Sequence, residues 1–449
     1  MKPPLLPLLL AALLPLATLH GEDRFPQPEF TTAYKAKAYQ HPAPRGTAME
    51  WVDVAVLLGA LALASTFALS RRRKAAVPRR RLAWLEGRLG LYALMLFCLL
   101  YFGFYRQGCI CPVGSVQNVT AALAGAGYVV PITVILFFAL PLVFALFFGR
   151  VFCASVCPLG AMQDLVALRP MKIPRALSQV LGVLPWAYLA VAVLFAATGT
   201  SWIICRLDPF VSFFRLSGDL TRILLGVLFL GIGLVVARPY CRFLCPYGAL
   251  LGLASRLSWK KVTVTPRECV QCRLCEHACP FDAIEKPEAP VDAQRPRALR
   301  RTGWLLAATP LWIALGAFLF WNLAPSIAHH HNTVFLSQRV RIEDRDPSLP
   351  KSWETRIWRE LGKSEEELHA QAGAIRSRLQ TGALFAGGFI GLVFGLTLVG
   401  LSRRVVRKDW EPDPAKCLAC GRCFAYCPVE YQNPDSPDSP TLRGGDKHG

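Results

Sequence analysis

The sequence lacks the glycine-rich motifs that bind nucleotides. Neither G-x-G-x-x-G nor G-x-x-x-x-G-K-S/T follows a predicted strand, so we expect no NAD site and no ATP site. Histidine is scarce, with 8 residues, and none lies in the apolar stretches described below, which argues against a bis-histidine haem b. Acidic residues number 30 against 50 basic ones, and this imbalance gives a formal charge of +20.

The positive charge is concentrated at the ends of long apolar segments. The chain is 53% hydrophobic over 449 residues, and several windows of about 17 to 25 residues are almost free of charge. Basic residues beside such windows are what membrane topology requires. We therefore expect a membrane protein and no nucleic-acid partner.

Seven apolar stretches are predicted to cross the membrane as helices. They lie at 51–70, 90–105, 128–148, 178–197, 221–236, 302–321 and 381–401. Seven basic residues between 71 and 81 follow the first stretch, and they place this loop in the cytoplasm and the N-terminus outside. Alternation then places 106–127 in an outer loop, Arg150 and Arg238 in inner loops, and the C-terminus in the cytoplasm. The expected location is the inner (plasma) membrane of a bacterium.

Two cysteine runs carry the clearest chemistry. Each has the spacing C-x2-C-x2-C-x3-C-P, in which three thiolates hold one 4Fe–4S cluster and the fourth reaches a second cluster. The predicted ligands are Cys269, Cys272, Cys275 and Cys427 for one cluster, and Cys417, Cys420, Cys423 and Cys279 for the other. Structural zinc, the alternative, usually takes paired C-x2-C knuckles and does not predict this run twice.

An apolar hairpin separates the two runs, so the ferredoxin domain is split and should sit close to the inner membrane face. The expected fold class is an all-α polytopic membrane protein with a small α+β bacterial-type ferredoxin domain. The predicted order is a signal peptide at 1–20 (with an uncleaved anchor as the alternative), an extracytoplasmic arm at 21–50, a transmembrane region at 51–258, the first ferredoxin half at 259–301, a hairpin with an outer loop at 302–401, and the second half with a tail at 402–449.

An internal repeat adds further cysteines. Residues 150–161 and 238–249 both have the pattern R-x-aromatic-C-x3-C-P-x-G-A, 88 residues apart. The inner thiols Cys153, Cys157, Cys241 and Cys245 could ligate a further iron–sulfur cluster, form redox-active dithiol pairs, or bind zinc or copper. The preceding outer loops contain Cys109, Cys111 and Cys205, for which we weigh a metal centre against a disulfide with Cys205. Cys98 is interpreted as a packing residue, and His329–His331 as a hydrated end of a span.

These motifs resemble the NosR/NapH-type membrane polyferredoxins, which combine several spans, two C-x3-C-P motifs and cytoplasmic 4Fe–4S runs. The resemblance covers about residues 90–430. It implies electron transfer between a quinol or cytoplasmic donor and an extracytoplasmic reductase, or support of that reductase's maturation. The chain departs from the NosR pattern because it shows no N-terminal flavin-binding domain, so any flavin carrier would be a separate protein. Accessory iron–sulfur proteins of cytochrome oxidase assembly are a second similar family.

We therefore expect two 4Fe–4S clusters in an electron carrier, or in a subunit of a membrane oxidoreductase, rather than in a stand-alone enzyme. The expected partners are the membrane, an extracytoplasmic reductase or flavoprotein, and quinone. No catalytic residue is predicted. The alternatives are a redox-sensing regulator, an assembly or maturation factor for a periplasmic metalloenzyme or cytochrome oxidase, and a metal transporter.

Overall fold

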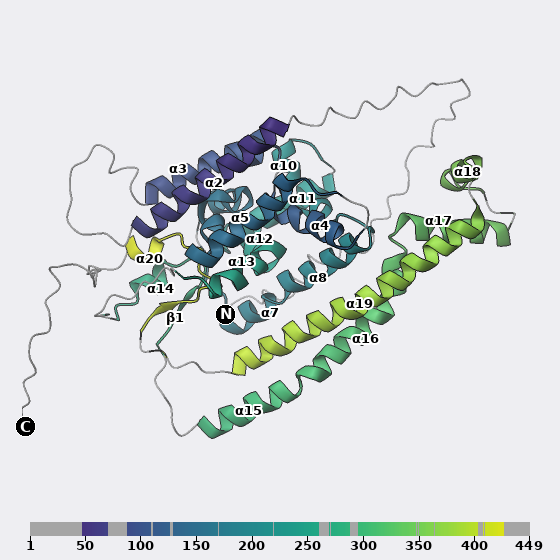
Figure 1. Cartoon of the computed structure of the whole chain (residues 1–449). Coiled ribbons are helices and arrows are strands. Elements are labelled where there is room, and N and C mark those ends of the chain that lie inside the picture. Colours follow the sequence, from purple (N-terminus) through teal and green to yellow (C-terminus); the bar gives the residue numbers. More distant parts are fainter. Residues whose placement is uncertain are drawn as a thin grey trace, which may run out of the picture. The chain divides into compact units, whose positions relative to one another are not determined.

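The computed structural model describes most of the chain between residues 47 and 425 (Figure 1). The described ranges are 47–70, 88–108, 111–125, 129–168, 170–218, 220–259, 269, 271–287, 295–346, 348, 350–362, 364–402, 407 and 409–425. The predicted signal peptide, nearly all of the arm, the basic loop at 71–81, Cys109 and Cys427 lie outside these ranges. The chain divides into units Met1–Met49 and Glu50–Gly449, and the fold below is that of the second.

The described residues are mostly helical, and the sequence repeat corresponds to two similar sets of helices. After α2 (Thr47–Ser70), copy 1 contains α3 (Arg88–Cys98), the π-helix η2 (Leu99–Tyr105), α4 (Pro112–Leu123), α5 (Ile132–Phe148), η3 (Phe152–Val156) and α6 (Pro158–Val166). After α7 (Arg175–Leu181), copy 2 contains α8 (Leu184–Ala197), α9 (Ile203–Leu207), α10 (Val211–Arg215), α11 (Leu220–Gly233), α12 (Pro239–Phe243) and α13 (Pro246–Arg256).

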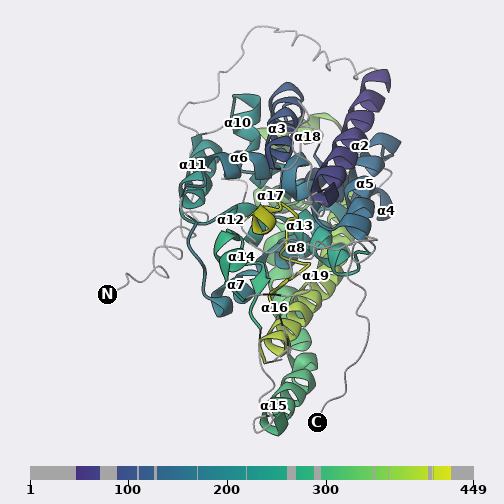
Figure 2. The ribbon, with the colours of Figure 1, turned by 90° about the vertical axis from the view of Figure 1, so that its left-hand side faces the viewer.

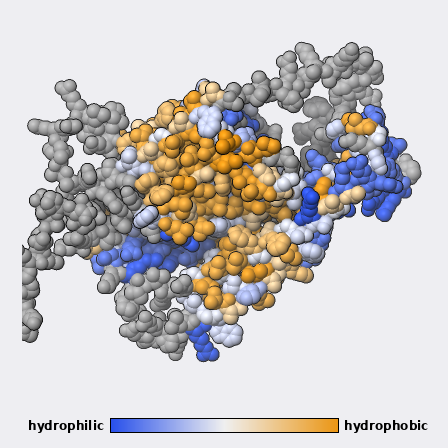
Figure 3. Space-filling model, viewed as in Figure 1, coloured by the Kyte–Doolittle hydropathy of each residue, from blue (hydrophilic) through white to orange (hydrophobic). Residues whose placement is uncertain are grey.

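Among the described residues, four helical stretches are long and apolar enough to cross a membrane. They are Ala48–Ala68, Arg175–Ala197, Arg300–Ala328 and Glu365–Ser402, and three shorter apolar helices are Leu89–Tyr105, Ile132–Phe148 and Leu220–Gly233. Each overlaps one of the predicted apolar stretches. Figure 3 shows apolar residues over the face of the bundle, and exposed side chains such as Leu100, Ile132 and Phe318 fit contact with lipid.

The predicted outer loop at 106–127 needs correction, because most of it forms the buried helix α4. Cys111 stands at the N-cap of α4 and Pro112 at its first position, which is the place where proline suits a helix. The helix packs against α5 and α8, and its first six residues are all buried. Its one long polar side chain there, Gln117, accepts a hydrogen bond from the Ile204 N–H at 3.0 Å. This pairing allows a polar residue in the core.

The insert between the ferredoxin runs is a hairpin of long helices. It contains α15 (Arg295–Ala307), α16 (Thr309–Ala328), α17 (Asn332–Arg345), α18 (Trp353–Glu360) and α19 (Glu365–Ser402). Helices α16 and α19 lie side by side (Figures 1 and 2). Their backbones approach so closely that a Cβ at Gly387 would overlap the carbonyl oxygen of Gly316. Helix α19 extends the predicted span at 381–401 toward its N-terminus through a polar segment that begins at Glu365.

The histidine cluster at 329–331 lies where α16 ends and α17 begins. The ring of His331 caps α17, because its Nδ1 accepts a hydrogen bond from the Thr333 N–H at 3.2 Å. His330 contacts the Ser326 carbonyl oxygen of its own helix at 3.3 Å. The cluster thus has a local structural role at the helix boundary.

A two-stranded sheet joins the two ferredoxin halves. Strand β1 (Ile284–Glu285) pairs antiparallel with β2 (Glu411–Pro412), with Ile284 opposite Pro412. Helix α14 (Leu274–Ala278) from the first half contacts α20 (Arg422–Ala425) from the second. Segments on either side of the hairpin are therefore in contact.

Candidate functional site

The first cysteine run is a tight turn followed by one short helix. Gln271 and Arg273 have positive φ values of 50° and 64°, so the chain turns sharply before α14. Cys275 lies in α14 and Cys279 ends it, in an extended conformation that directs the chain toward β1. Cys272, which lies in this turn, is exposed.

The second run is also a tight turn. Ala419 and Gly421 have positive φ values of 54° and 66°, and this turn aims the Ala419 N–H at the sulfur of Cys417, 3.4 Å away. The Cys417 N–H in turn donates to the Asp413 carbonyl oxygen at 2.8 Å. Backbone N–H groups directed at sulfur are among the features that tune iron–sulfur clusters.

The structure brings Cys279 of the first run together with the second run. Cys279, Cys417 and Cys420 pack around one buried cluster that contains Phe281 and Leu418. Around a second cluster, Cys269, Cys275 and Cys279 pack against Ile284, Trp410 and Cys423. Cys427, the residue expected to cross in the opposite direction, lies outside the described residues.

These cysteines are neighbours in the packing rather than a closed coordination sphere. Among the described residues, no three His, Cys, Asp or Glu side chains are arranged closely enough to hold a metal ion. Burial raises the pKa of Cys417 to about 12 and also raises the pKa of Cys279. Both thiols are therefore protonated when unligated, and binding a cluster would release their protons. Soft sulfur donors at this spacing fit an iron–sulfur group.

Ion pairs attach the first ferredoxin half to the loops of the helical bundle. Arg242, at the end of α12, contacts Asp282 at 3.1 Å. Lys172 contacts Glu276 at 3.3 Å. The backbone N–H of Ile173 also donates to Asp282, at 3.2 Å. The first half is thus held on both copies of the repeat.

Two hydrogen bonds attach the second ferredoxin half to the same region. The Ser255 hydroxyl in α13 donates to the Pro414 carbonyl oxygen at 2.7 Å. The Arg150 guanidinium donates to the Ala415 carbonyl oxygen at 2.8 Å. Cys153 packs against the same apolar residues as Cys279, Cys417 and Cys420. The second run therefore directly adjoins the first C-x3-C-P motif.

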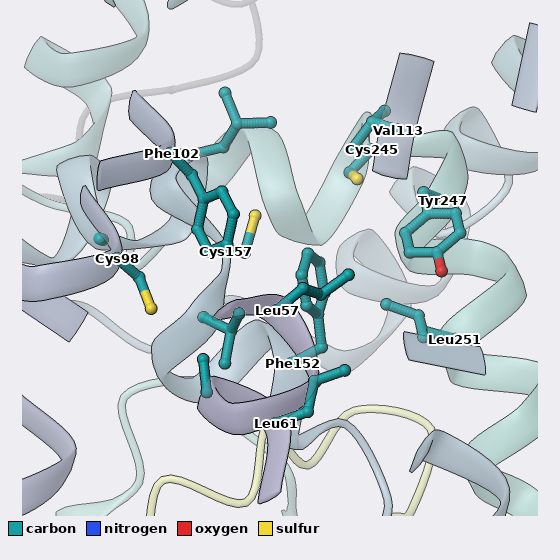
Figure 4. Packing of buried hydrophobic residues seen from close by; sticks show 14 of the residues in the cluster. Leu57, Leu61, Cys98, Phe102, Val113, Phe152, Cys157, Cys245, Tyr247 and Leu251 are labelled. Carbon is teal, nitrogen blue, oxygen red and sulfur yellow. The ribbon is translucent and has the colours of Figure 1, made fainter. Parts of the chain in front are cut away.

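The four C-x3-C-P cysteines lie in one packed core. Cys157 and Cys245 are buried in the main apolar cluster (Figure 4). Cys153 and Cys241 pack against this cluster. Cys98 is fully buried in the same cluster, as its interpretation as a packing residue predicts.

The outer cysteines lie closer to this core than the topology alone indicates. Cys111 packs against the main cluster, which also contains Cys157. The sulfur of Cys205 lies beside Gly114, where an added Cβ would be 3.3 Å away. The structure therefore brings Cys111 and Cys205 together at the start of α4, while Cys109 lies outside the described residues.

Two arginines of the predicted cytoplasmic loops, Arg150 and Arg238, are buried in the protein. Arg150 is 8% exposed and Arg238 is 1% exposed. Arg238 forms an ion pair with Asp164 at 2.5 Å, and this partner offsets the cost of burying its charge. Both arginines occupy the first position of the repeat, and this recurrence could have indicated a structural role. The sequence analysis used their charges only to orient the chain in the membrane.

Sequence reasoning also missed two buried polar residues near the thiols. Gln163 in α6 donates from Nε2 to the sulfur of Cys241 at 3.1 Å, and it accepts from the Tyr240 N–H at 3.1 Å. Asp208 is 5% exposed and accepts from the Phe210 N–H at 2.8 Å. Asp208 stands directly before a proline, as Cys245 does. This shared position is a sequence signal by which Asp208 could have been found.

Family models match the cysteine motifs. The model Fer4_5, a 4Fe-4S binding domain, matches residues 130–176 and 219–265, which contain the two C-x3-C-P motifs. The model Fer4, also a 4Fe-4S binding domain, matches residues 262–285. Both copies of the repeat and the first ferredoxin run are therefore related to known iron–sulfur domains.

Curated relatives cover part of the chain. Protein NirI of Paracoccus denitrificans (strain Pd 1222) is 31% identical over 226 residues, which is 47% of this chain and 33% of that protein. The putative electron transport protein YccM of Escherichia coli (strain K12) is 40% identical over 70 residues, 16% of this chain and 19% of that protein. The uncharacterized protein MJ0749 of Methanocaldococcus jannaschii is 39% identical over 72 residues, 16% of this chain and 29% of that protein. The chain thus spans a third or less of these relatives. No solved structure matches.

Proposed function

Because the chain is a membrane polyferredoxin of the NosR/NapH type, we propose that it passes electrons between a cytoplasmic or quinol donor and an extracytoplasmic reductase system. An iron–sulfur electron-transfer role follows from the matched 4Fe-4S domains and from the relative named as an electron transport protein. The donor, the acceptor and the path are parts of the proposal.

The proposed cofactors are two 4Fe–4S clusters in the split ferredoxin domain. Their ligands are Cys269, Cys272, Cys275 and Cys427 for one cluster, and Cys417, Cys420, Cys423 and Cys279 for the other. When bound, the clusters supply one-electron redox chemistry. The observation that carries the proposal is the packing of Cys279 beside Cys417 and Cys420 from the distant second run. Cross-ligation of this kind is what a two-cluster ferredoxin requires.

The proposed path enters the membrane at the first C-x3-C-P motif. Cys153 packs against the apolar residues that also surround Cys417 and Cys420, and Arg150 links this motif to the second ferredoxin loop. From there the path continues through the packed core that contains Cys157 and against which Cys111 packs. The proposed orientation has the ferredoxin domain in the cytoplasm and Cys111 toward the outside.

A small cavity of about 20 Å³ lies beside the ferredoxin domain. It is lined by Tyr92 and Leu91 of α3, by Asp164 of α6, and by Cys420 and Arg422. Apolar and hydrogen-bonding groups thus lie together beside a proposed cluster ligand. A cavity of this size does not hold a quinol, so the quinol donor in the proposal rests on the family resemblance and not on this cavity.

Anaerobic purification tests the cofactor part of this proposal. We expect at least about eight irons per protein and broad absorbance near roughly 400 nm that bleaches on reduction, as two thiolate-ligated cubanes demand. Much less iron with no such absorbance would refute it. Transfer of electrons from reduced protein to an acceptor outside sealed vesicles then distinguishes a conduit from a redox sensor, whose clusters would change state without transfer.

A further inference from the structure

The two copies of the repeat pack reciprocally. Each C-x3-C-P motif begins a half-helix, with Cys157 at the N-cap of α6 and Cys245 at the N-cap of α13. Helix α6 of copy 1 packs against η2 of its own copy and α11 of copy 2. Helix α13 of copy 2 packs against α8 of its own copy and α5 of copy 1. Both half-helices are therefore held between the copies, and sites in repeat proteins commonly form at such interfaces.

The buried arginine of each copy reaches the half-helix of the other copy. Arg238 donates to the carbonyl oxygens of Cys153 and Ala154 in copy 1, and its guanidinium would lie 2.9 Å from a Cβ at Gly160. In the reciprocal contact, the Arg150 guanidinium would lie 3.2 Å from a Cβ at Gly248. Glycine at these two positions makes room for the crossing side chains.

Hydrogen-bond donors surround the sulfurs in this interface. Cys241 accepts from the Gln163 side chain of the other copy at 3.1 Å. Cys245 accepts from the Gly248 N–H at 3.3 Å. The Arg150 guanidinium lies 3.8 Å from the sulfur of Cys153. Such donors stabilise thiolates that ligate a metal and fix their orientation.

The charges in this interface favour an anion. Arg150 is more than nine-tenths buried, it forms no carboxylate ion pair in the described part of the chain, and its Nε has no hydrogen-bond partner. Arg238 has one carboxylate partner, Asp164. The N-termini of α6 and α13 add partial positive charge. A buried cation without an anion is costly, so a group with net negative charge fits beside Arg150.

From these contacts we propose that the two copies jointly hold one additional thiolate-ligated iron–sulfur centre. Cys153 and Cys157 from copy 1 and Cys241 and Cys245 from copy 2 are its four ligands. Each copy supplies two cysteines, so neither closes a four-thiolate site by itself. Arg150 is a positioning residue whose charge stabilises the centre. Its place as a relay between the ferredoxin clusters and the outside rests on the proposed function.

Metal analysis of full-length, anaerobically purified variants tests whether the centre is shared. We expect Cys153→Ser and Cys241→Ser each to lose about two or about four irons, for a 2Fe–2S or a 4Fe–4S centre. The double variant should lose no more than either single variant. Additive losses would mean two separate sites. One bound zinc per protein with unchanged iron, or no metal loss at all, would equally overturn the proposal.

Controls separate this inference from misfolding and from the proposed function. Cys98→Ser alters a buried cysteine of the same core and should keep all iron. Retention of the reduced ferredoxin electron paramagnetic resonance signals in Cys241→Ser shows that the variant folds. If those signals are present and Cys241→Ser loses no iron, this inference fails alone. If the ferredoxin clusters are absent from the unmodified protein, the proposed function fails.

The potential of the additional centre tests the role of Arg150. Arg150→Gln should lower the midpoint potential of the signal that disappears in Cys241→Ser, because a nearby positive charge favours the reduced, more negative centre. Arg150→Lys should keep the potential close to the unmodified value. A purely structural role for Arg150 would leave the potential of the assembled centre unchanged in both variants, and that result would overturn its assignment.

Discussion

Replacing Cys279 by serine should remove the cluster of the second run and spare that of the first. Cys279 follows Cys275 closely in sequence, yet it packs beside Cys417 and Cys420, which are more than a hundred residues away. The strand pair β1–β2 holds the two segments together. A cubane with one thiolate missing is labile, so the iron content should fall by about four per protein.

Double variants show which cluster Cys279 serves. Cys279→Ser combined with Cys417→Ser should lose the same four irons, about as many as either change alone, because both remove one cluster. Cys279→Ser combined with Cys272→Ser should lose about eight, because both clusters are then incomplete. The assay is iron per protein after anaerobic purification, with Cys98→Ser as the control. If the second pair loses about four irons and the first pair about eight, Cys279 belongs to the first run and the reasoning is refuted.

Three further predictions concern the fold around the site. Gly391→Ala should destabilise the hairpin by about 1–3 kcal/mol, because the added Cβ overlaps the Trp312 carbonyl oxygen; Gly373→Ala in the open part of the same helix should instead raise the unfolding midpoint in detergent. Asp53→Ala should lower the free energy of unfolding by about 3–5 kcal/mol, because it strands the buried Arg106 that pairs with it; a loss below about 1 kcal/mol in denaturant titration would contradict this. Burial alone would raise the pKa of Glu343, but hydrogen bonds from Ser352 and Thr355 lower this pKa below the ordinary glutamate value. Its stabilising contribution is therefore present above the ordinary glutamate pKa and is lost as pH falls through the lowered value, so hydrogen exchange in α17 and α18 should rise below pH about 4. Glu343→Gln should show that faster exchange already at neutral pH.

The sequence was sufficient for the local chemistry. Cysteine spacing predicts both ferredoxin runs without any tertiary information, because thiolates close in sequence can ligate one cluster. The repeat was visible for the same reason, since the R-x-aromatic-C-x3-C-P pattern recurs in full at Arg150 and Arg238. The apolar helices follow from hydropathy, because each stretch satisfies its own backbone hydrogen bonds.

The rest depends on contacts between residues far apart in the chain. Hydropathy assigns 106–127 to a loop, because it scores the composition of α4 and cannot register that Gln117 finds a partner in Ile204. Charge counting cannot show that Arg238 is buried, because the partner that allows its burial, Asp164, belongs to the other copy. Hydropathy predicts only the apolar part of α19, at 381–401. The polar part before it continues as the same helix, so the full length of α19 was not predicted.

Electron transfer across a sealed vesicle tests the central proposal most directly. The protein is reconstituted anaerobically with the ferredoxin domain facing an internal pool of dithionite, and a membrane-impermeant acceptor is added outside. The account predicts acceptor reduction well above that of empty vesicles, and loss of this excess in Cys279→Ser, with Cys98→Ser unchanged. Acceptor reduction equal to that of empty vesicles, by protein that retains its clusters, would contradict the account.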